Sequence, residues 1–149
     1  MEDVRTQRPL GHWLKHIDGA IEGAMARLFA EEGLTRRDWQ ILNTVSYEPV
    51  PLSRIDESLA PFLSPTAPTV RPRVDALTAR GWTVLAPDTT VTLTDEGHAA
   101  HRRIAAQVAA LRTRITQCLS REEFGTLMTL LQRLGEHVDT VTTEPARGA

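Results

Sequence analysis

The sequence predicts a mainly α-helical protein with a small β-wing, in which a winged helix-turn-helix domain is joined to a helical dimerisation body. Three observations predict it: helical periodicity near both ends of the 149-residue chain, three shorter helical segments between them, and a hairpin rich in Thr and Val after the third. Three helices followed by a hairpin is the order of a winged helix-turn-helix. The outer helices are longer than so small a domain can cover, so we expect them to pack against a second copy of the chain.

Length and composition narrow the possibilities before any element is assigned. A chain of 149 residues with 41% hydrophobic residues is about one domain with a core of its own. No apolar run approaches the roughly 18–20 residues of a membrane span, and the amino terminus has no apolar segment typical of a secretory signal. The single Cys118 excludes an internal disulfide. These features predict a cytoplasmic protein that makes no contact with a membrane.

The first predicted helix runs from Pro9 to Glu32. Proline suits the first turn of a helix, and Gly33 suits the position just past its end. A stripe of apolar residues that lasts about five turns indicates a partner helix. This stripe consists of Leu10, Leu14, Ile17, Ile21, Ala24 and Leu28.

Two shorter helices follow. Thr35, with Asp38 three residues later, is typical of a capped helix start, and that helix ends near Tyr47. Pro51 opens the next helix, which ends at Pro61.

The third short helix follows the pattern of residues 64–80, with an inner face formed by Val70, Val74 and Leu77. Prolines interrupt its first half. A proline deep in a helix removes a hydrogen bond and clashes with the preceding turn, which costs about 3 kcal/mol. We therefore expect the regular part of this helix to begin near Thr69, or the helix to kink at Pro72.

Two short β runs, 82–86 and 90–94, flank the turn residues Pro87, Asp88 and Thr89. Their Thr and Val content and the turn between them predict a hairpin.

Two long helices close the chain. Thr94 caps the first, and Ser120 with Glu123 forms a capping box that opens the second. With the first helix of the chain, they predict a homodimer whose interface consists mainly of Leu10, Leu14, Ile17, Leu127, Leu131, Leu134 and Val138.

Three strings of residues carry a resemblance to a known family: GLTRRDWQILNTV (33–45), VDALTARGW (74–82) and VTLTDEGHA (91–99). They resemble the second helix, the end of the recognition helix and the Leu-Thr-x-x-Gly strand that leaves the wing in MarR family transcription regulators. The resemblance covers residues 10–138 and implies a homodimer that binds double-stranded operator DNA. It implies a helical dimerisation region (1–33 and 98–142), a winged helix-turn-helix DNA-binding domain (34–97) and a flexible tail (143–149).

The resemblance also implies where DNA would be held. Arginines and hydroxyls of the helix-turn-helix would contact phosphates, and few residues would contact bases. The residues are Arg54, Thr66, Thr69, Arg71, Arg73 and Thr89.

Two features depart from a DNA-binding pattern. The wing tip carries Asp88 as its single charge, and residues 36–97 contain six arginines against eight carboxylates. Phosphate contacts supply most non-specific affinity, so an acidic surface weakens it. The alternative is a winged-helix dimer that has lost strong DNA binding and acts as a ligand- or protein-binding module.

In the family, the crevice where the dimer helices meet the winged domain binds effectors. Here the resemblance places Trp13, His16 and Trp39 in that crevice, as the walls of a pocket for a small lipophilic or aromatic effector. The alternative is that both tryptophans only pack the core.

Other chemistry finds little support in the sequence. His12 and His16, like His98 and His101, are one turn apart, but no cysteine or acidic cluster accompanies them, so we expect no metal site. No cofactor-binding motif and no nucleophile motif is present, and we expect no cofactor and no enzymatic activity. We expect Cys118 to be a buried apolar residue.

Overall fold

The structure, a computed structural model, describes residues 8–143. They form two compact units, and the first unit ends at Ala109 and the second begins at Ala110. Of the expected tail 143–149, only Thr143 is described, as the last residue of the last helix. Residues 1–7 of the expected dimerisation region likewise lie outside the described residues.

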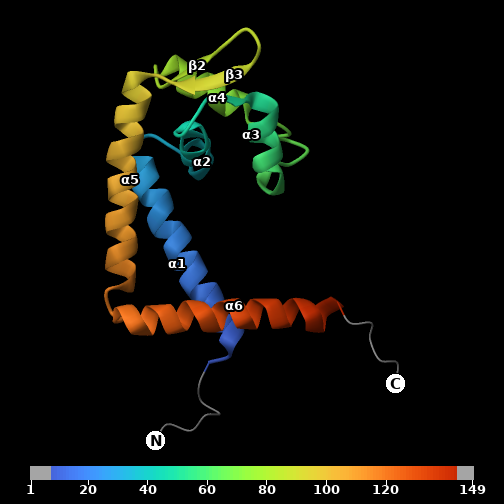
Figure 1. Ribbon diagram of the computed structural model, residues 1–149, viewed down its shortest axis with the longest axis vertical. Helices are drawn as coiled ribbons and strands as arrows, with labels where there is room; N and C mark the ends of the chain where they lie inside the picture. Colours follow the sequence, from blue (N-terminus) through green and yellow to red (C-terminus); the bar gives the residue numbers. More distant parts are fainter. Residues whose placement is uncertain (1–7, 144–149) are drawn as a thin grey trace, which may run out of the picture. The chain divides into compact units, whose positions relative to one another are not determined.

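The first unit has the predicted order of elements (Figure 1). It contains α1 (Leu10–Glu31), α2 (Arg36–Val45), α3 (Leu52–Ser58), the short 3₁₀ turn η2 (Ala60–Phe62), α4 (Arg71–Ala79), a small sheet and the first part of α5 (Asp95–Thr116). Its core draws side chains from every one of the helices α1 to α5. The fully buried apolar residues include Phe29, Ile41, Leu42, Ile55, Val74, Val91 and Ile104.

The sheet has three antiparallel strands in the order β1–β3–β2: β1 (Val50–Pro51), β2 (Thr83–Leu85) and β3 (Thr90–Leu93). The sequence predicted β2 and β3 as a hairpin and missed β1. A strand of two residues that ends in proline has no periodicity, and proline cannot donate to a sheet, so the sequence carries no strand signal there. Val50 pairs with Val91, and β1 leads directly into α3.

The wing is joined to α5 through Thr94. Its hydroxyl donates to the carbonyl oxygen of Gly81 at 2.6 Å and accepts from the N–H of Gly97 at 3.0 Å. Its backbone N–H donates to the carbonyl oxygen of Trp82 at 3.0 Å. A Cβ atom at Gly97 would overlap that same carbonyl oxygen. The Leu-Thr-x-x-Gly string therefore has a physical role: the threonine ties the hairpin to the helix, and the glycine leaves room for the contact.

α4 begins at Arg71, well inside the 64–80 pattern. Pro72 is the second residue of the helix, where a missing N–H removes no helical hydrogen bond. Before it, Ser64 and Ala67 exchange two backbone hydrogen bonds of 3.1 and 3.0 Å in a tight turn. The prediction that the prolines displace the start of this helix is confirmed.

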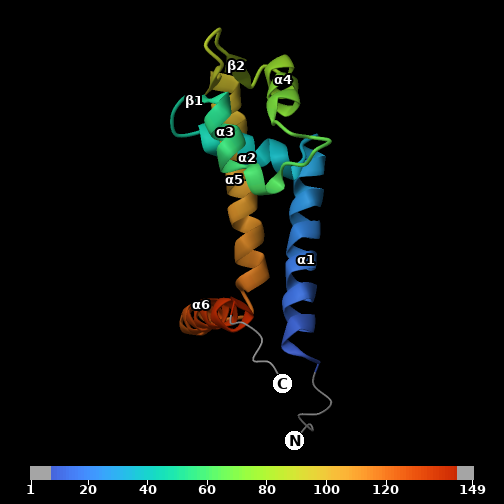
Figure 2. The same ribbon diagram turned by 90° about the vertical axis from the view of Figure 1, so that its right-hand side faces the viewer.

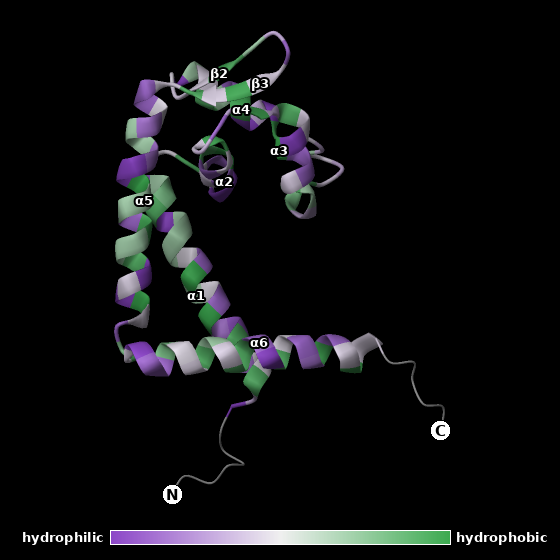
Figure 3. Cartoon of the chain, viewed as in Figure 1, coloured by the Kyte–Doolittle hydropathy of each residue, from purple (hydrophilic) through white to green (hydrophobic). Residues whose placement is uncertain are grey.

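The second unit contains the end of α5 and α6 (Arg121–Thr143). The predicted capping box opens α6: the Ser120 hydroxyl accepts from the N–H of Glu123 at 3.0 Å, and the Glu123 carboxylate accepts from the N–H of Ser120 at 2.9 Å. These hydrogen bonds lower the pKa of Glu123. No residue of α6 is buried, although apolar residues recur along the helix (Figure 3).

Cys118 is exposed, so the prediction of a buried residue is wrong. α5 ends at Thr116, and Cys118 lies in the turn that leads to α6. The helical stripe from which the prediction was made has ended before this position. No helix within residues 8–143 is long and apolar enough to cross a membrane.

Candidate nucleic-acid interface

α4 and the wing lie at the same end of the first unit (Figures 1 and 2). The inner face of α4 buries Val74 and Leu77 in the core, as the sequence predicted. Its outer face leaves exposed Arg71, Pro72, Asp75 and Ala76. A helix with a solvent-exposed polar face beside a hairpin is an arrangement that fits the major groove of DNA.

Arg54 and Thr66 are exposed, as a DNA contact requires. Arg54 lies on α3 and has no ion pair or hydrogen bond to any described residue. Thr66 lies in the turn before α4, where its hydroxyl is 3.1 Å from the Ser64 hydroxyl. Both side chains are available to a ligand.

Thr69 is bonded within the protein. Its hydroxyl donates to the carboxylate of Asp56 on α3, with oxygen–oxygen distances of 2.8 and 3.1 Å. The same carboxylate accepts from the N–H of Val70 at 2.8 Å. The hydroxyl of Thr69 in turn accepts from the N–H of Arg71 at 3.2 Å. Thr69 thus forms part of the start of α4 and offers little to DNA.

Arg73 is bonded within the protein as well. Its Nε and Nη2 atoms each lie 2.7 Å from a different oxygen of Asp38, a bidentate pair. Asp38 is 1% exposed and also accepts from the N–H of Thr35 at 2.9 Å, which completes the predicted capping box of α2. The hydrogen bond to Asp38 raises the pKa of Arg73 above its ordinary value. Arg73 joins α4 to α2.

The tip of the wing is a strained turn. The N–H of Thr89 donates to the carbonyl oxygen of Ala86 at 2.8 Å, and the Asp88 carboxylate accepts from the N–H of Thr90 at 3.1 Å. Thr89 is exposed and has a φ of 67°, a value that β-branched residues rarely adopt. Its carbonyl oxygen accepts from the N–H of Leu52, the first residue of α3, at 3.0 Å. Asp88 therefore stabilises the turn and also places a negative charge at its tip.

The other end of α4 is held by α1. Arg80 donates to the carbonyl oxygens of Glu32 at 2.5 Å and Gly33 at 3.4 Å, and its guanidinium lies 3.9 Å from the ring centroid of Trp82. The Glu32 carboxylate pairs with Arg103 of α5 at 2.8 Å, and this hydrogen bond lowers the pKa of Glu32. The carboxyl end of α1 therefore connects α4 with α5.

The three residues expected in one effector crevice do not meet within the chain. Trp39 is buried and stacks on Phe29 of α1 and His101 of α5, with ring centroids 5.7 and 5.1 Å away. Trp13 and His16 are exposed near the start of α1, and their ring centroids lie 6.2 Å apart. Trp13 and Phe29 are 16 positions apart on α1, so the two lie about 24 Å apart along the helix. In the described chain the alternative, that both tryptophans pack the core, holds for Trp39 and fails for the exposed Trp13.

The His101 ring closes this stack. Its Nε2 atom lies 3.1 Å from Oδ1 of Asn43 on α2. Burial, helped by the nearby positive charges of His98 and Arg102, lowers the pKa of His101. Burial therefore disfavours the charged form of this ring.

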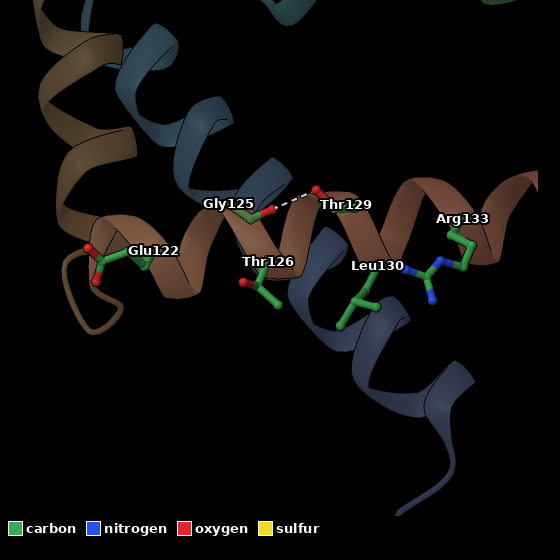
Figure 4. A pocket seen from close by; sticks show the side chains of 6 residues that line it. All are labelled: Glu122, Gly125, Thr126, Thr129, Leu130 and Arg133. Carbon is green, nitrogen blue, oxygen red and sulfur yellow. Dashed lines mark hydrogen bonds between the residues drawn. The ribbon is translucent and has the colours of Figure 1, made fainter.

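A shallow hollow lies on the surface of α6 (Figure 4). Its lining residues all come from this one helix: Glu122, Gly125, Thr126, Thr129, Leu130 and Arg133. The face of a single helix cannot enclose a small molecule, so the hollow is not a ligand site by itself.

Sequence reasoning missed two residues that organise this end of the molecule, Asp56 and Arg80. Their partners are 13 and 48 residues away in the sequence. Only Asp38 gave a signal, through its capping pattern with Thr35.

Comparison with known proteins supports the architecture. No protein-family model matches the sequence, and no curated protein does. Among solved structures, the MarR family protein Rv2887 of Mycobacterium tuberculosis in complex with DNA is similar, with a TM-score of 0.67 and 23% identity over 87% of this chain and 99% of that chain. The reduced form of MarR from E. coli is similar with a TM-score of 0.68 and 20% identity, over 90% of this chain and 98% of that chain. Rv2887 in complex with salicylic acid is similar with a TM-score of 0.62 and 20% identity, over 88% of this chain and 99% of that chain. The predicted winged-helix fold, as MarR family proteins have it, is confirmed.

Proposed function

We propose that this chain is a homodimeric transcription regulator that binds double-stranded DNA through α3, α4 and the wing. The observation that carries the proposal is the placement of the exposed face of α4 beside the wing, in a fold shared with a protein solved in complex with DNA. DNA binding accounts for the unpaired Arg54 and for the exposed Arg71 on this surface. A binding protein, rather than an enzyme, is the class that these features support.

The expected contacts are few. Arg54 would bind a phosphate, and Arg71 would reach a base edge. The exposed hydroxyls of Thr66 and Thr89 would add hydrogen bonds to the backbone or to base edges. Thr69 and Arg73, named with them from the sequence, already have partners inside the protein. Direct readout of bases should therefore be thin, with one arginine from α4 in each subunit.

The homodimer rests on two unpartnered apolar faces. Leu10, Leu14 and Ile17 of α1 are exposed by 55, 41 and 49%, and α6 buries none of its residues. A helix with an apolar stripe gains stability only when that stripe is covered. We propose a second copy as the cover, which supplies the twofold arrangement that a palindromic operator needs. Sedimentation at micromolar concentration tests this, and a monomer contradicts it.

We further propose that a small aromatic effector modulates DNA binding. The support is the likeness to Rv2887 in complexes with salicylic acid and with p-aminosalicylic acid. An effector that prefers one dimer arrangement weakens DNA binding by the same factor by which DNA weakens effector binding. A salicylate titration of the protein–DNA complex tests the idea: release of DNA supports it, and an unchanged affinity up to saturation contradicts it.

DNA binding is tested by fluorescence anisotropy on duplexes selected from a random-sequence pool. We expect a selected duplex to bind more tightly than its scrambled version, and the affinity of both to fall as salt rises. Failure of the wild-type dimer to bind any duplex at low salt contradicts the proposal.

One alternative has an observation of its own. Asp56, Asp75 and Asp88 lie at or near the proposed DNA-binding surface, and residues 36–97 carry more carboxylates than arginines. This favours a winged-helix dimer that acts as a ligand- or protein-binding module. The substitution Asp88→Arg separates the two, because it removes a repulsion at the wing tip. In a DNA-binding protein, this substitution should tighten binding to both duplexes. In a ligand- or protein-binding module, it should leave both duplexes unbound.

A further inference from the structure

Two carboxylates from neighbouring helices hold the start of α4. Asp56 on α3 accepts the hydroxyl of Thr69 and the N–H of Val70, and Asp38 on α2 binds both Nε and Nη2 of Arg73. Val70, at the N-cap position, has no capping side chain of its own. The helix therefore obtains its amino-terminal stabilisation from α2 and α3.

The backbone donors of the first turn are fully accounted for. Asp56 takes the N–H of Val70, the Thr69 hydroxyl takes the N–H of Arg71, and Pro72 has none. The N–H of Arg73 reaches the carbonyl oxygen of Val70 at 2.9 Å. No donor is left over, so the start of α4 is fixed without any ligand.

Arg71 and Arg73 cannot serve the same surface. Successive residues of an α-helix are rotated by about 100°, so two residues apart they point in nearly opposite directions. The guanidinium of Arg73 is bound to α2, and Arg71 is exposed, with a long 4.0 Å contact to Asp75 on the same helix.

We propose that Arg73 is a positioning residue: its pair with Asp38 fixes the rotation of α4 on α2 and so directs Arg71, the arginine of α4 that contacts DNA. This inference rests on the proposed DNA-binding function. A phosphate that captured Arg73 would leave the carboxylate of Asp38, 1% exposed, buried without its positive partner. The pair is therefore retained when DNA binds, and the two arginines of α4 have separate roles.

The inference predicts that removing the charge of Asp38 weakens the preference for the selected duplex as much as removing Arg73 does, although Asp38 is buried and negative. The experiment compares wild type with Arg71→Ala, Arg73→Gln, Asp38→Asn and the double variant Asp38→Asn/Arg73→Gln. Each is titrated with salt on a duplex selected from a random-sequence pool and on its scrambled version. Arg73→Lys, which keeps the charge but has a single donor group, is added in case Arg73→Gln fails to fold.

We expect Arg71→Ala to reduce the preference for the selected duplex about tenfold, because it removes the base contact of α4. Asp38→Asn and Arg73→Gln should each reduce the preference for the selected duplex about tenfold and leave the slope on the scrambled duplex unchanged. The double variant should be no worse than either single one, because both remove the same pair. Arg73→Lys should lose preference in the same way.

Two results overturn the inference while the DNA-binding function stands. One is an Asp38→Asn variant that keeps the wild-type preference. The other is an Arg73→Gln variant that lowers the salt slope by about 1 per subunit, which would make Arg73 a phosphate contact. A wild-type protein that binds neither duplex overturns the proposed function itself, and the inference with it.

Discussion

The two units of the chain treat the same apolar periodicity differently. In the first unit the stripes of α2, α4 and the start of α5 end in a core where Ile41, Val74 and Ile104 have no exposed surface. In the second unit the stripe of α6 is equally regular, yet Leu127 and Val138 remain 41 and 45% exposed. The comparison teaches that an amphipathic pattern predicts burial but not the partner. The helices α2, α4 and the start of α5 find their partners within the chain, and we propose that α6 finds its partner in a second copy.

The largest expected effect is the loss of the proposed contact between α6 and a second copy. The double substitution Leu127→Glu/Leu131→Glu puts two charges into the proposed dimer interface, where each would be buried without a counter-ion. We expect the dimer to dissociate at micromolar concentration, as measured by analytical ultracentrifugation, and DNA binding to be lost with it.

The control is Glu136→Ala, on the opposite face of the same helix. It should leave the dimer intact. If the Leu127→Glu/Leu131→Glu protein remains a dimer, the apolar face of α6 is not the interface, and the proposed cover of this face is wrong.

The second effect compares glycines in the two units. Gly97 has no space for a Cβ, because the carbonyl oxygen of Trp82 occupies it, whereas Gly135 on α6 has no neighbouring atom within 4 Å. Gly97→Ala should destabilise the protein by about 3 kcal/mol or more, since the wing must move away from α5. Gly135→Ala should stabilise it by up to about 1 kcal/mol, through helix propensity alone. Urea unfolding measures both.

A destabilising Gly135→Ala would also be informative. It would mean that the second copy packs closely against this position. The surface of α6 would then be closely covered, as the core residues of the first unit are. A neutral Gly97→Ala would contradict the contact between the wing and α5.

These comparisons show which parts of the structure the sequence could predict. Helices and their caps depend on residues close together in the sequence. Nearby residues therefore predicted the apolar periodicity of the helices, the capping box of Thr35 and the displacement of α4 by its prolines. The strand β1 was not, because two residues carry no period. The contacts of Asp56, Arg73 and Arg80 were not either, since each joins segments distant in the sequence and charge alone does not name a partner.

The candidate site was predicted only in part for the same reason. The sequence predicted the inner face of α4, but it named Arg73 together with Arg71 as a DNA contact and gave no sign of an internal pair. The pair with Asp38 depends on how α4 is rotated on α2, which no local pattern determines. Likewise, Trp13 and Trp39 are both aromatic, but only the fold shows that Trp13 lies near the start of α1, whereas Trp39 on α2 packs against Phe29 near the end of α1.

The third effect concerns pH and the core of the first unit. The pKa of His101 is lowered by burial, so the folded state binds its proton less readily than the unfolded state does. Stability is therefore at its full value well above the ordinary pKa of about 6.5 and falls as the pH drops from that value towards the lowered pKa of the folded state. We expect His101→Gln to remove this part of the pH dependence, in urea unfolding series between about pH 7.5 and 5.

His137 on α6 provides the control from the second unit, since it is exposed. His137→Gln should leave the pH dependence as in wild type. Identical pH profiles for wild type and His101→Gln would show that the stack with Trp39 does not disfavour protonation.

The smallest effect lies at the wing tip. Thr89 is held at a φ of 67°, where a β-branched side chain is strained and glycine is not. Relief of this strain outweighs the greater freedom of glycine in the unfolded chain, so Thr89→Gly should stabilise the first unit by about 0.5–1 kcal/mol. The matched control is Thr92→Gly, an exposed position within β3, where glycine should destabilise by about the same amount. The measurement is the midpoint of urea unfolding at unchanged slope. If both glycines destabilise equally, the turn at Thr89 is not strained, and its backbone differs from that of a left-handed residue.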